Sequence, residues 1–197
     1  FDETDGDVLA NSGKGLAEDR AASRLESAVA GGESARRVPG KFGGALEFDG
    51  VDDFAESGFE GISGQSPRTV SLWARVPADL TTDQSYAMVS WGNVRGQGSA
   101  WQISVNPQEK DGPLGALRAG TGQAAVVGST DLRDGAWHHL TVVMYGGAVP
   151  STATHVLLYR NALKLSLYWH VQTMQRFHRA STWLFFDLLR LDGVCCK

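Results

Sequence analysis

Two adjacent histidines, His138 and His139, stand beside Trp137 in the stretch DGAWHHLTVVMYGG, residues 134–147. Paired imidazoles could hold a metal ion or supply a general base. The run that follows them is typical of a β-strand. Successive side chains of a strand point to opposite faces, so the two rings could not bind the same ion.

The two histidines therefore belong to different environments. The face of His138 is otherwise apolar and holds Leu140, Val142 and Met144. The face of His139 is mixed and holds Trp137, Thr141, Val143 and Tyr145. We expect His138 to be a core-edge histidine whose ring nitrogens bond the backbone or a nearby hydroxyl, and His139 to face solvent or a ligand. Since no G-x-S-x-G nucleophile motif is present, neither histidine is predicted to be catalytic.

The stretch ALEFDGVDDF, residues 45–54, offers three carboxylates at spacings that a glycoside hydrolase could use. Alternation places Glu47 and Asp49 on one strand face, as nucleophile and orienting group, with Asp52 where the general acid would stand. The third carboxylate is an Asp rather than the longer Glu, and Gly50 indicates that the strand ends in a turn. A turn whose acids cap backbone N–H groups is favoured over a hydrolytic site.

Calcium binding is favoured over hydrolysis as the role of the same acids, because calcium takes six to eight oxygen ligands from carboxylates, carbonyls and water. Asp49, Asp52 and Asp53 are the predicted ligands, joined by the acids of DETDGD, residues 2–7. The spacing is not that of an EF-hand loop. The alternative is that these acids are solvated turn residues.

A third candidate site is the loop within SWGNVRGQGSAW, residues 90–101, where an aromatic ring could stack on a sugar. Its predicted ligand-binding residues are Trp91, Asn93, Arg95 and Gln97. A flexible, glycine-rich loop without a ligand is the alternative. Trp101 shares a strand face with Ile103 and Val105 and is predicted to be core.

These candidates must be positioned by short β-strands. From about residue 45 onward, runs of five to nine apolar-rich residues alternate with Gly, Asp, Asn and Pro turns. In TVSLWARV, residues 69–76, one face carries Val70, Leu72, Ala74 and Val76. Such strands without intervening helices predict an all-β, two-sheet sandwich. The one helix-like stretch, residues 16–30, is predicted to be either a short N-terminal helix or a polar loop insertion.

Composition excludes some classes of function. The formal charge of −4 over 197 residues argues against a nucleic-acid binder, which would need a basic face. No stretch approaches the roughly 18 apolar residues of a membrane span. The two cysteines, Cys195 and Cys196, are neighbours, which gives neither a disulfide framework nor a CxxC metal spacing. The chain starts at Phe1 without an initiator Met, so we expect a piece of a longer precursor.

Four motifs together resemble the laminin G-like group of concanavalin A-like jelly-roll domains. They are GKFGGALEFDGVDDF, TVSLWARV, DLRDGAWHHLTVVMYGG and HVLLYRNA, and the opening FDETDGDVLANSGKG also fits, so the resemblance covers residues 1–162. It implies an antiparallel jelly-roll sandwich in an extracellular, periplasmic or cell-surface protein, often with structural calcium. It further implies a non-catalytic binding or adhesion module for a glycan or protein, beside other domains of a parent chain. The alternatives are a glucanase-like hydrolase using Glu47, Asp49 and Asp52, and a spacer without a ligand.

The composition changes near residue 163. The tail, residues 163–197, holds only one of the 24 glycines, Gly193, and nothing in it resembles the family's usual last strand. One hypothesis is that a frameshift or wrong gene boundary replaced the native ending. The other is a genuine apolar helix or extra strands that pack on a partner. We therefore predict a jelly-roll domain over residues 1–162 followed by an atypical tail.

Overall fold

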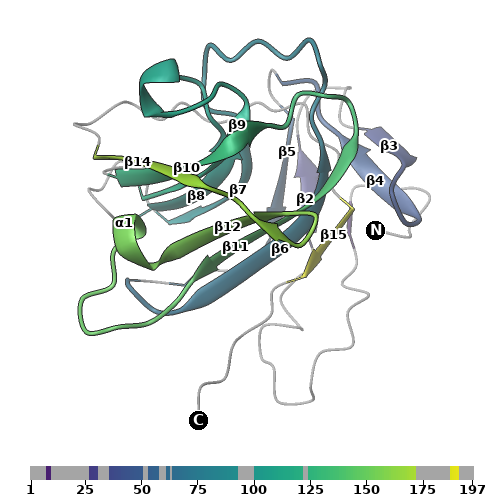
Figure 1. Cartoon of the computed structure of the whole chain (residues 1–197). Coiled ribbons are helices and arrows are strands. Elements are labelled where there is room, and N and C mark those ends of the chain that lie inside the picture. Colours follow the sequence, from purple (N-terminus) through teal and green to yellow (C-terminus); the bar gives the residue numbers. More distant parts are fainter. Residues whose placement is uncertain are drawn as a thin grey trace, which may run out of the picture.

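The structure is a computed structural model that describes residues 8–9, 27–30, 36–50, 53–57, 61–62, 64–92, 100–121, 124–171 and 187–190. Two five-stranded antiparallel sheets lie one above the other, with smaller sheets beside them (Figure 1). This arrangement confirms the predicted all-β, two-sheet sandwich.

We call the two large sheets sheet I and sheet II. Sheet I has the strand order β13 (Leu163–Lys164), β12 (Val156–Arg160), β11 (Trp137–Met144), β6 (Arg68–Arg75) and β15 (Asp187–Arg190). Sheet II has the order β14 (Leu167–Val171), β10 (Ala124–Asp131), β9 (Ala116–Gly120), β8 (Ala100–Val105) and β7 (Ala87–Gly92). Two short helices stand outside the sheets, η2 (Glu109–Asp111) and α1 (Thr152–His155).

The pairing of β6 with β11 forms the centre of sheet I. Eight residue pairs run without a break from Trp137 opposite Arg75 to Met144 opposite Arg68. Burial alternates residue by residue in both strands, because each strand presents an apolar row to the interior and a mixed row outward. Both predicted faces are confirmed, and His138 and His139 lie on opposite sides of the sheet.

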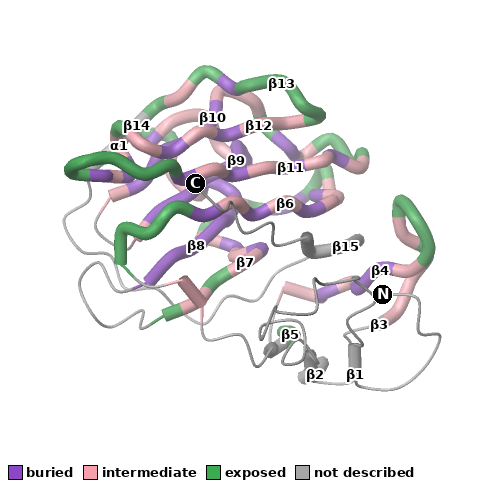
Figure 2. The backbone as a smooth tube through the Cα atoms, turned by 90° about the horizontal axis from the view of Figure 1, so that it is seen from below, coloured by how far each residue is buried: buried purple, intermediate pink, exposed green. Residues whose placement is uncertain are grey.

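The core fills the space between the two sheets. The inner face of sheet II contributes the predicted core residues Trp101, Ile103 and Val105, each at most 2% exposed. They pack in one cluster with residues from sheet I such as Leu72 and Leu140. Figure 2 shows the buried residues running along the strands of both sheets. Each large apolar side chain buried in this way stabilises the fold by roughly 1.5–3 kcal/mol.

In sheet II, every residue of β8 and of β9 is buried, including those that point away from the core. Gln102, Ser104 and Arg118 are the polar residues in these two strands. Burial lowers the pKa of Arg118, and the charge of Asp111 acts in the opposite direction. In sheet I, by contrast, β6 and β11 have one partly exposed face.

Smaller sheets precede the sandwich. β2 (Ser27–Ala30) pairs with β1 (Val8–Leu9) and β5 (Phe54–Ser57), while β3 (Arg36–Pro39) pairs with β4 (Gly44–Glu47). Neither alternative predicted for residues 16–30, a short helix or a polar loop, holds for the last four residues, because Ser27–Ala30 forms a strand that pairs with β5. The rest of that prediction, residues 16–26, lies outside the described residues.

Residues that follow position 162 take part in both large sheets. β13 pairs with β12, Leu165 is buried, and β14 pairs with β10 over five residues. β15 pairs with β6 at the far edge of sheet I. The frameshift and native-tail hypotheses both stay predictions, and Cys195 and Cys196 lie outside the described residues. No helix within the described ranges is long and apolar enough to cross a membrane.

β12 and β13 are joined by the two-residue turn Asn161–Ala162, since Arg160 lies opposite Leu163. Both turn residues have positive φ, 52° for Asn161 and 64° for Ala162. A two-residue hairpin favours this geometry because its twist matches that of the strands. Asn tolerates the left-handed region, whereas Ala is strained there through its Cβ.

We predict that Ala162→Gly raises the free energy of unfolding by about 1 kcal/mol, because glycine adopts positive φ without this strain. Urea denaturation of the two proteins measures the change. Ala148→Gly is the matched control, since Ala148 is exposed and its φ is not positive; this change should lower stability slightly. An Ala162→Gly protein that is no more stable than the original would show that the turn is unstrained.

Candidate functional site

A hollow of about 380 Å³ lies on the outer face of sheet I and is lined by Trp73, His139, Asn161 and Ala162. We call it the platform hollow. Trp73 on β6 and His139 on β11 are direct cross-strand partners. The Asn161–Ala162 turn reaches the hollow from the end of β12, the neighbouring strand on the other side of β11. Three segments distant in sequence therefore meet at this surface.

Aromatic rings form the floor of the platform hollow. The rings of Trp73 and His139 are 5.2 Å apart between centroids and tilted by 44°. Phe42, which is 64% exposed, stands edge-on to Trp73 at 5.4 Å. The Lys41 ammonium lies 5.6 Å from the Trp73 ring centroid, within cation–π range. The surface thus combines exposed aromatic area with a positive charge.

Hydrogen bonds fix the polar groups of the platform hollow. His139 Nε2 is hydrogen bonded to Ser71 Oγ at 2.7 Å, and Thr141 Oγ1 lies 3.3 Å from the same hydroxyl. The His139 backbone N–H donates to the side-chain oxygen Oδ1 of Asn161 at 2.9 Å. The Asn161 backbone N–H donates in return to the His139 carbonyl at 2.8 Å. His139 lies on the outer, partly exposed face, as expected, and neighbours on two strands and a turn hold it there.

His138 lies beneath the platform hollow and is only 5% exposed, as predicted for a core-edge residue. The partners predicted for it were wrong. Its Nε2 contacts both oxygens of Asp134, at 2.9 and 3.0 Å, and its Nδ1 lies 3.3 Å from Asn161 Nδ2. The D-G turn before β11 brings Asp134 back over the ring, so a carboxylate and an amide take the places expected for backbone or hydroxyl groups.

Asp134 is held as a carboxylate by this arrangement. Burial acts to raise the pKa of Asp134. The Ala136 N–H, the His138 ring and the charge of Arg160 act in the other direction and together bring that pKa below its usual range. A negative charge therefore stays beside His138.

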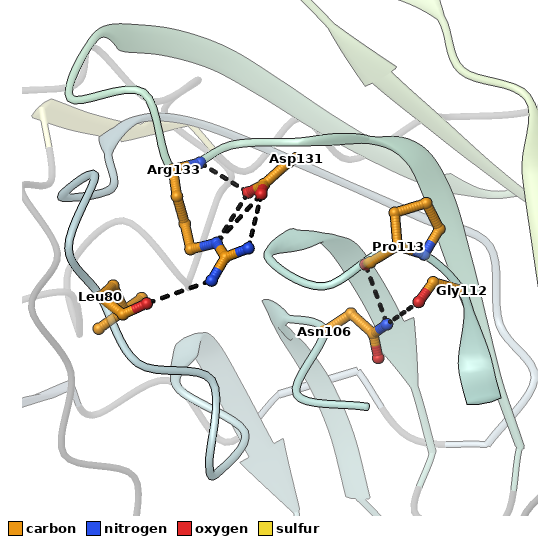
Figure 3. A network of polar contacts seen from close by, with 6 residues as sticks. All are labelled: Leu80, Asn106, Gly112, Pro113, Asp131 and Arg133. Carbon is orange, nitrogen blue, oxygen red and sulfur yellow. Dashed lines mark hydrogen bonds and ion pairs between the residues drawn. The ribbon is translucent and has the colours of Figure 1, made fainter. Parts of the chain in front are cut away.

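A second hollow, of about 860 Å³, lies beside η2, and we call it the η2 hollow. It is lined by Glu109, Lys110, Asp111, Gly112, Pro113, Leu114, Asp131, Arg133, Leu167 and Tyr168. Figure 3 shows the two polar networks that shape this region. Both are built from side chains that bind loop carbonyls or each other.

In the first network, the amide of buried Asn106 donates to the carbonyls of Gln108, Gly112 and Pro113, at 2.8 to 3.0 Å. One side chain thus holds both ends of the loop that follows β8. In the second, Arg133 binds both oxygens of Asp131 and donates to the Leu80 carbonyl at 3.3 Å. In both networks the polar side chains stabilise the loops that border the η2 hollow.

The predicted ligand-binding residue Trp91 is partly buried and packs against the core. Its Nε1–H donates to the Ile62 carbonyl at 3.1 Å, and its ring stacks on Trp101 at 6.1 Å. The Arg68 guanidinium lies over both indoles, and a Cβ at Gly61 would overlap the Trp91 ring. Asn93, Arg95 and Gln97 lie outside the described residues, so sugar binding by this loop stays a prediction.

Arg68 itself is 3% exposed and organises the segment in front of β6. It donates to the carbonyls of Ile62, Gly64 and Ser66, at 2.6 to 2.9 Å. Burial lowers the pKa of Arg68. The loop carbonyls and the two indole faces provide the polar and aromatic surroundings that a buried guanidinium requires.

The predicted carboxylate site is described only in part. Glu47 and Asp49 line neither of the two hollows, and Asp52 lies outside the described residues. Asp53 is 2% exposed and accepts the Asp49 N–H at 2.8 Å, which is the capping role of a turn. Within the described ranges, no three His, Cys, Asp or Glu side chains group to hold a metal ion. Calcium at Asp49, Asp52 and Asp53 stays a prediction without support from this geometry.

A family model, described as the concanavalin A-like lectin/glucanases superfamily, matches residues 49–166, more than half of the chain. The chain belongs to this superfamily. The match confirms the laminin G-type resemblance, and such domains generally bind carbohydrate or protein without catalysis and are commonly extracellular. No curated protein matches the chain.

The platform hollow was missed by the sequence reasoning, although one signal was present. Trp73 falls on the outward face of TVSLWARV, as His139 does on its own strand. Trp73 and His139 are neighbours because β6 pairs with β11 in one particular register. The alternation within a single strand predicts neither the pairing nor the register.

The Asp131–Arg133 pair predicts a pH-dependent contribution to stability. Burial acts to raise the pKa of Asp131, but the hydrogen bonds from Arg133 outweigh it and leave that pKa below its usual value of 3.8. A lowered pKa in the folded state gives stability that is present above pH 3.8 and is lost as the pH falls through the folded value.

Asp131→Asn should therefore lower stability at neutral pH, and its deficit relative to the original protein should shrink between about pH 5 and about pH 2. Urea denaturation at several pH values measures this. Asp79→Asn, an exposed substitution with the same charge change, is the control and should show a smaller deficit at neutral pH. A deficit for Asp131→Asn that does not depend on pH would contradict the role given to the pair.

Proposed function

We propose that this domain is a non-catalytic glycan-binding module and that a saccharide occupies the platform hollow. The observation that carries the proposal is the meeting of Trp73, His139 and Asn161 on one partly exposed sheet face. Ligand sites are typically concave and aromatic, with a few polar groups that fix orientation. The volume of about 380 Å³ is in the range of small-ligand pockets.

The chemistry of these side chains suits a sugar. A pyranose has an apolar face of C–H groups, which can lie against the electron-rich face of an indole such as Trp73. Its hydroxyls both donate and accept hydrogen bonds, and the amide of Asn161 and the ring of His139 can do the same. Phe42 extends the aromatic surface beyond Trp73 and gives room for a second sugar unit.

The other functions considered have less support. A hydrolase would need carboxylates around the substrate, and Trp73, His139, Asn161 and Ala162 supply none to the platform hollow. A protein ligand would use the same aromatic surface but would not require so local a hollow. A spacer domain without a ligand gains nothing from aromatic rings such as Trp73 and Phe42 on a partly exposed face, since contact with water is unfavourable for them. We propose an extracellular, periplasmic or cell-surface location, as is common for this superfamily.

The test is calorimetric titration with a panel of cello-, laminari-, xylo- and manno-oligosaccharides and galactosides. We expect at least one saccharide to bind and Trp73→Ala to weaken its binding about tenfold or more, which corresponds to ~1.4 kcal/mol. Tyr145→Ala is the matched control, because Tyr145 is an aromatic residue immediately after β11, 43% exposed and outside the hollow.

Thermal melts of both variants confirm that they fold. Equal loss of binding in Trp73→Ala and Tyr145→Ala would move the site away from the platform hollow. Cleavage of a saccharide by the purified domain would overturn the non-catalytic reading. No binding across the panel would favour the protein-ligand or spacer alternatives.

A further inference from the structure

The hydrogen bonds around Asn161 fix which of its side-chain atoms is which. The His139 backbone N–H can only donate, so the atom 2.9 Å from it is the amide oxygen, Oδ1. The other atom is then Nδ2, which can only donate. It lies 3.3 Å from His138 Nδ1, so that ring nitrogen must accept and carry no proton.

The same reasoning assigns the other nitrogen of His138. A neutral ring without a proton on Nδ1 carries it on Nε2. His138 Nε2 lies 2.9 and 3.0 Å from the Asp134 oxygens, to which it donates. A directed chain results, in which His138 donates to Asp134 and accepts from Asn161, and Asn161 accepts from the backbone of His139.

Among the described residues, His138 Nδ1 is the acceptor found for the Asn161 side-chain amide, which leaves one of its hydrogens for another partner. An amide nitrogen carries two hydrogens, and His138 Nδ1 takes one of them. Asn161 is exposed and lines the platform hollow. Its second N–H is therefore the group on this side chain that can donate to an acceptor there.

We propose that His138, oriented by Asp134, is a positioning residue that holds the Asn161 amide as a hydrogen-bond donor to a saccharide oxygen in the platform hollow. The ligand contact rests on the proposed function, whereas the orientation of Asn161 does not. A ring protonated on both nitrogens could no longer accept from Asn161. The amide would then have to turn its oxygen toward His138, and the His139 N–H would lose its acceptor.

The charged surroundings of His138 come from a few elements. Among the described residues, the charged group in contact with the ring is Asp134, in the turn before β11. Arg160 on β12 and Asp131 at the end of β10 interact with Asp134 through their charges. On β6, the residue opposite His138 is Ala74, which carries no charge. Ring protonation would thus be felt mainly by Asp134 on one side and Asn161 on the other.

The orientation is tested by nitrogen-15 NMR of the whole chain between about pH 8 and about pH 5, the range in which histidine changes charge. At neutral pH we expect the His138 tautomer with the proton on Nε2. As the ring is protonated, the Asn161 side-chain amide and the His139 backbone amide should shift with the same midpoint. A proton on Nδ1 at neutral pH, or unresponsive amides, would overturn the proposal.

His138→Gln is the informative variant, because its side-chain oxygen can accept from Asn161 at any pH. In this variant the Asn161 side-chain amide should no longer respond to pH, and the His139 backbone amide should keep only the response caused by its own ring. His155→Gln is the control, since His155 lies in α1 and contacts Tyr145 rather than Asn161. Loss of the pH response in His155→Gln as well would mean that another group causes it.

The ligand contact is tested with whichever saccharide of the panel the protein binds. We expect the affinity to fall about tenfold between neutral pH and a pH at which the NMR spectra show the His138 ring protonated, the effect of losing one hydrogen bond, and to stay level in His138→Gln. Asn161→Gly keeps the positive φ and should bind weakly at both pH values. An affinity independent of pH would overturn the donor role of Asn161. If no saccharide binds, the proposed function fails, and the NMR experiment still decides the role of His138.

Discussion

The pairing of β6 with β11 is the constraint on which the rest of the structure depends. It aligns two alternating strands so that their apolar rows face sheet II together and their mixed rows face outward together. A slip of one residue would exchange the rows, placing Leu72 in solvent and Trp73 in the core. The register that buries the core is therefore the same register that sets Trp73 opposite His139. Core and candidate site cannot vary independently.

Much of this arrangement could be predicted from alternation alone. The period of two in residues 69–76 and 137–145 correctly gave the inward rows, the separation of His138 from His139 and the sandwich class. These are properties of single strands with one buried face, and so they can be read locally. The motifs for the superfamily then indicated how the strands are connected.

What could not be predicted depends on contacts between segments. Asn161 lies 23 residues from His138 and meets it because β12 returns beside β11 and ends in a tight turn. Trp91 was favoured as a ligand residue because it stands beside a glycine-rich loop. The side chains of Trp101 and Arg68, which pack against Trp91, come from other strands. Trp73, which lines the platform hollow, was not among the predicted ligand-binding residues, because its partner His139 comes from another strand.

The burial of β8 and β9 on both faces has a consequence for how the domain would meet its surroundings. Among the described strands, sheet I presents a partly open face in its two central strands and sheet II does not. The outer faces of the two sheets therefore differ in how far their central strands are exposed. A polymer or a cell wall approaching from the side of sheet II would find covered strands, and one approaching from the side of sheet I would find the rings of Trp73 and Phe42. A ligand site in the platform hollow would therefore require that sheet I, and not sheet II, faces the ligand.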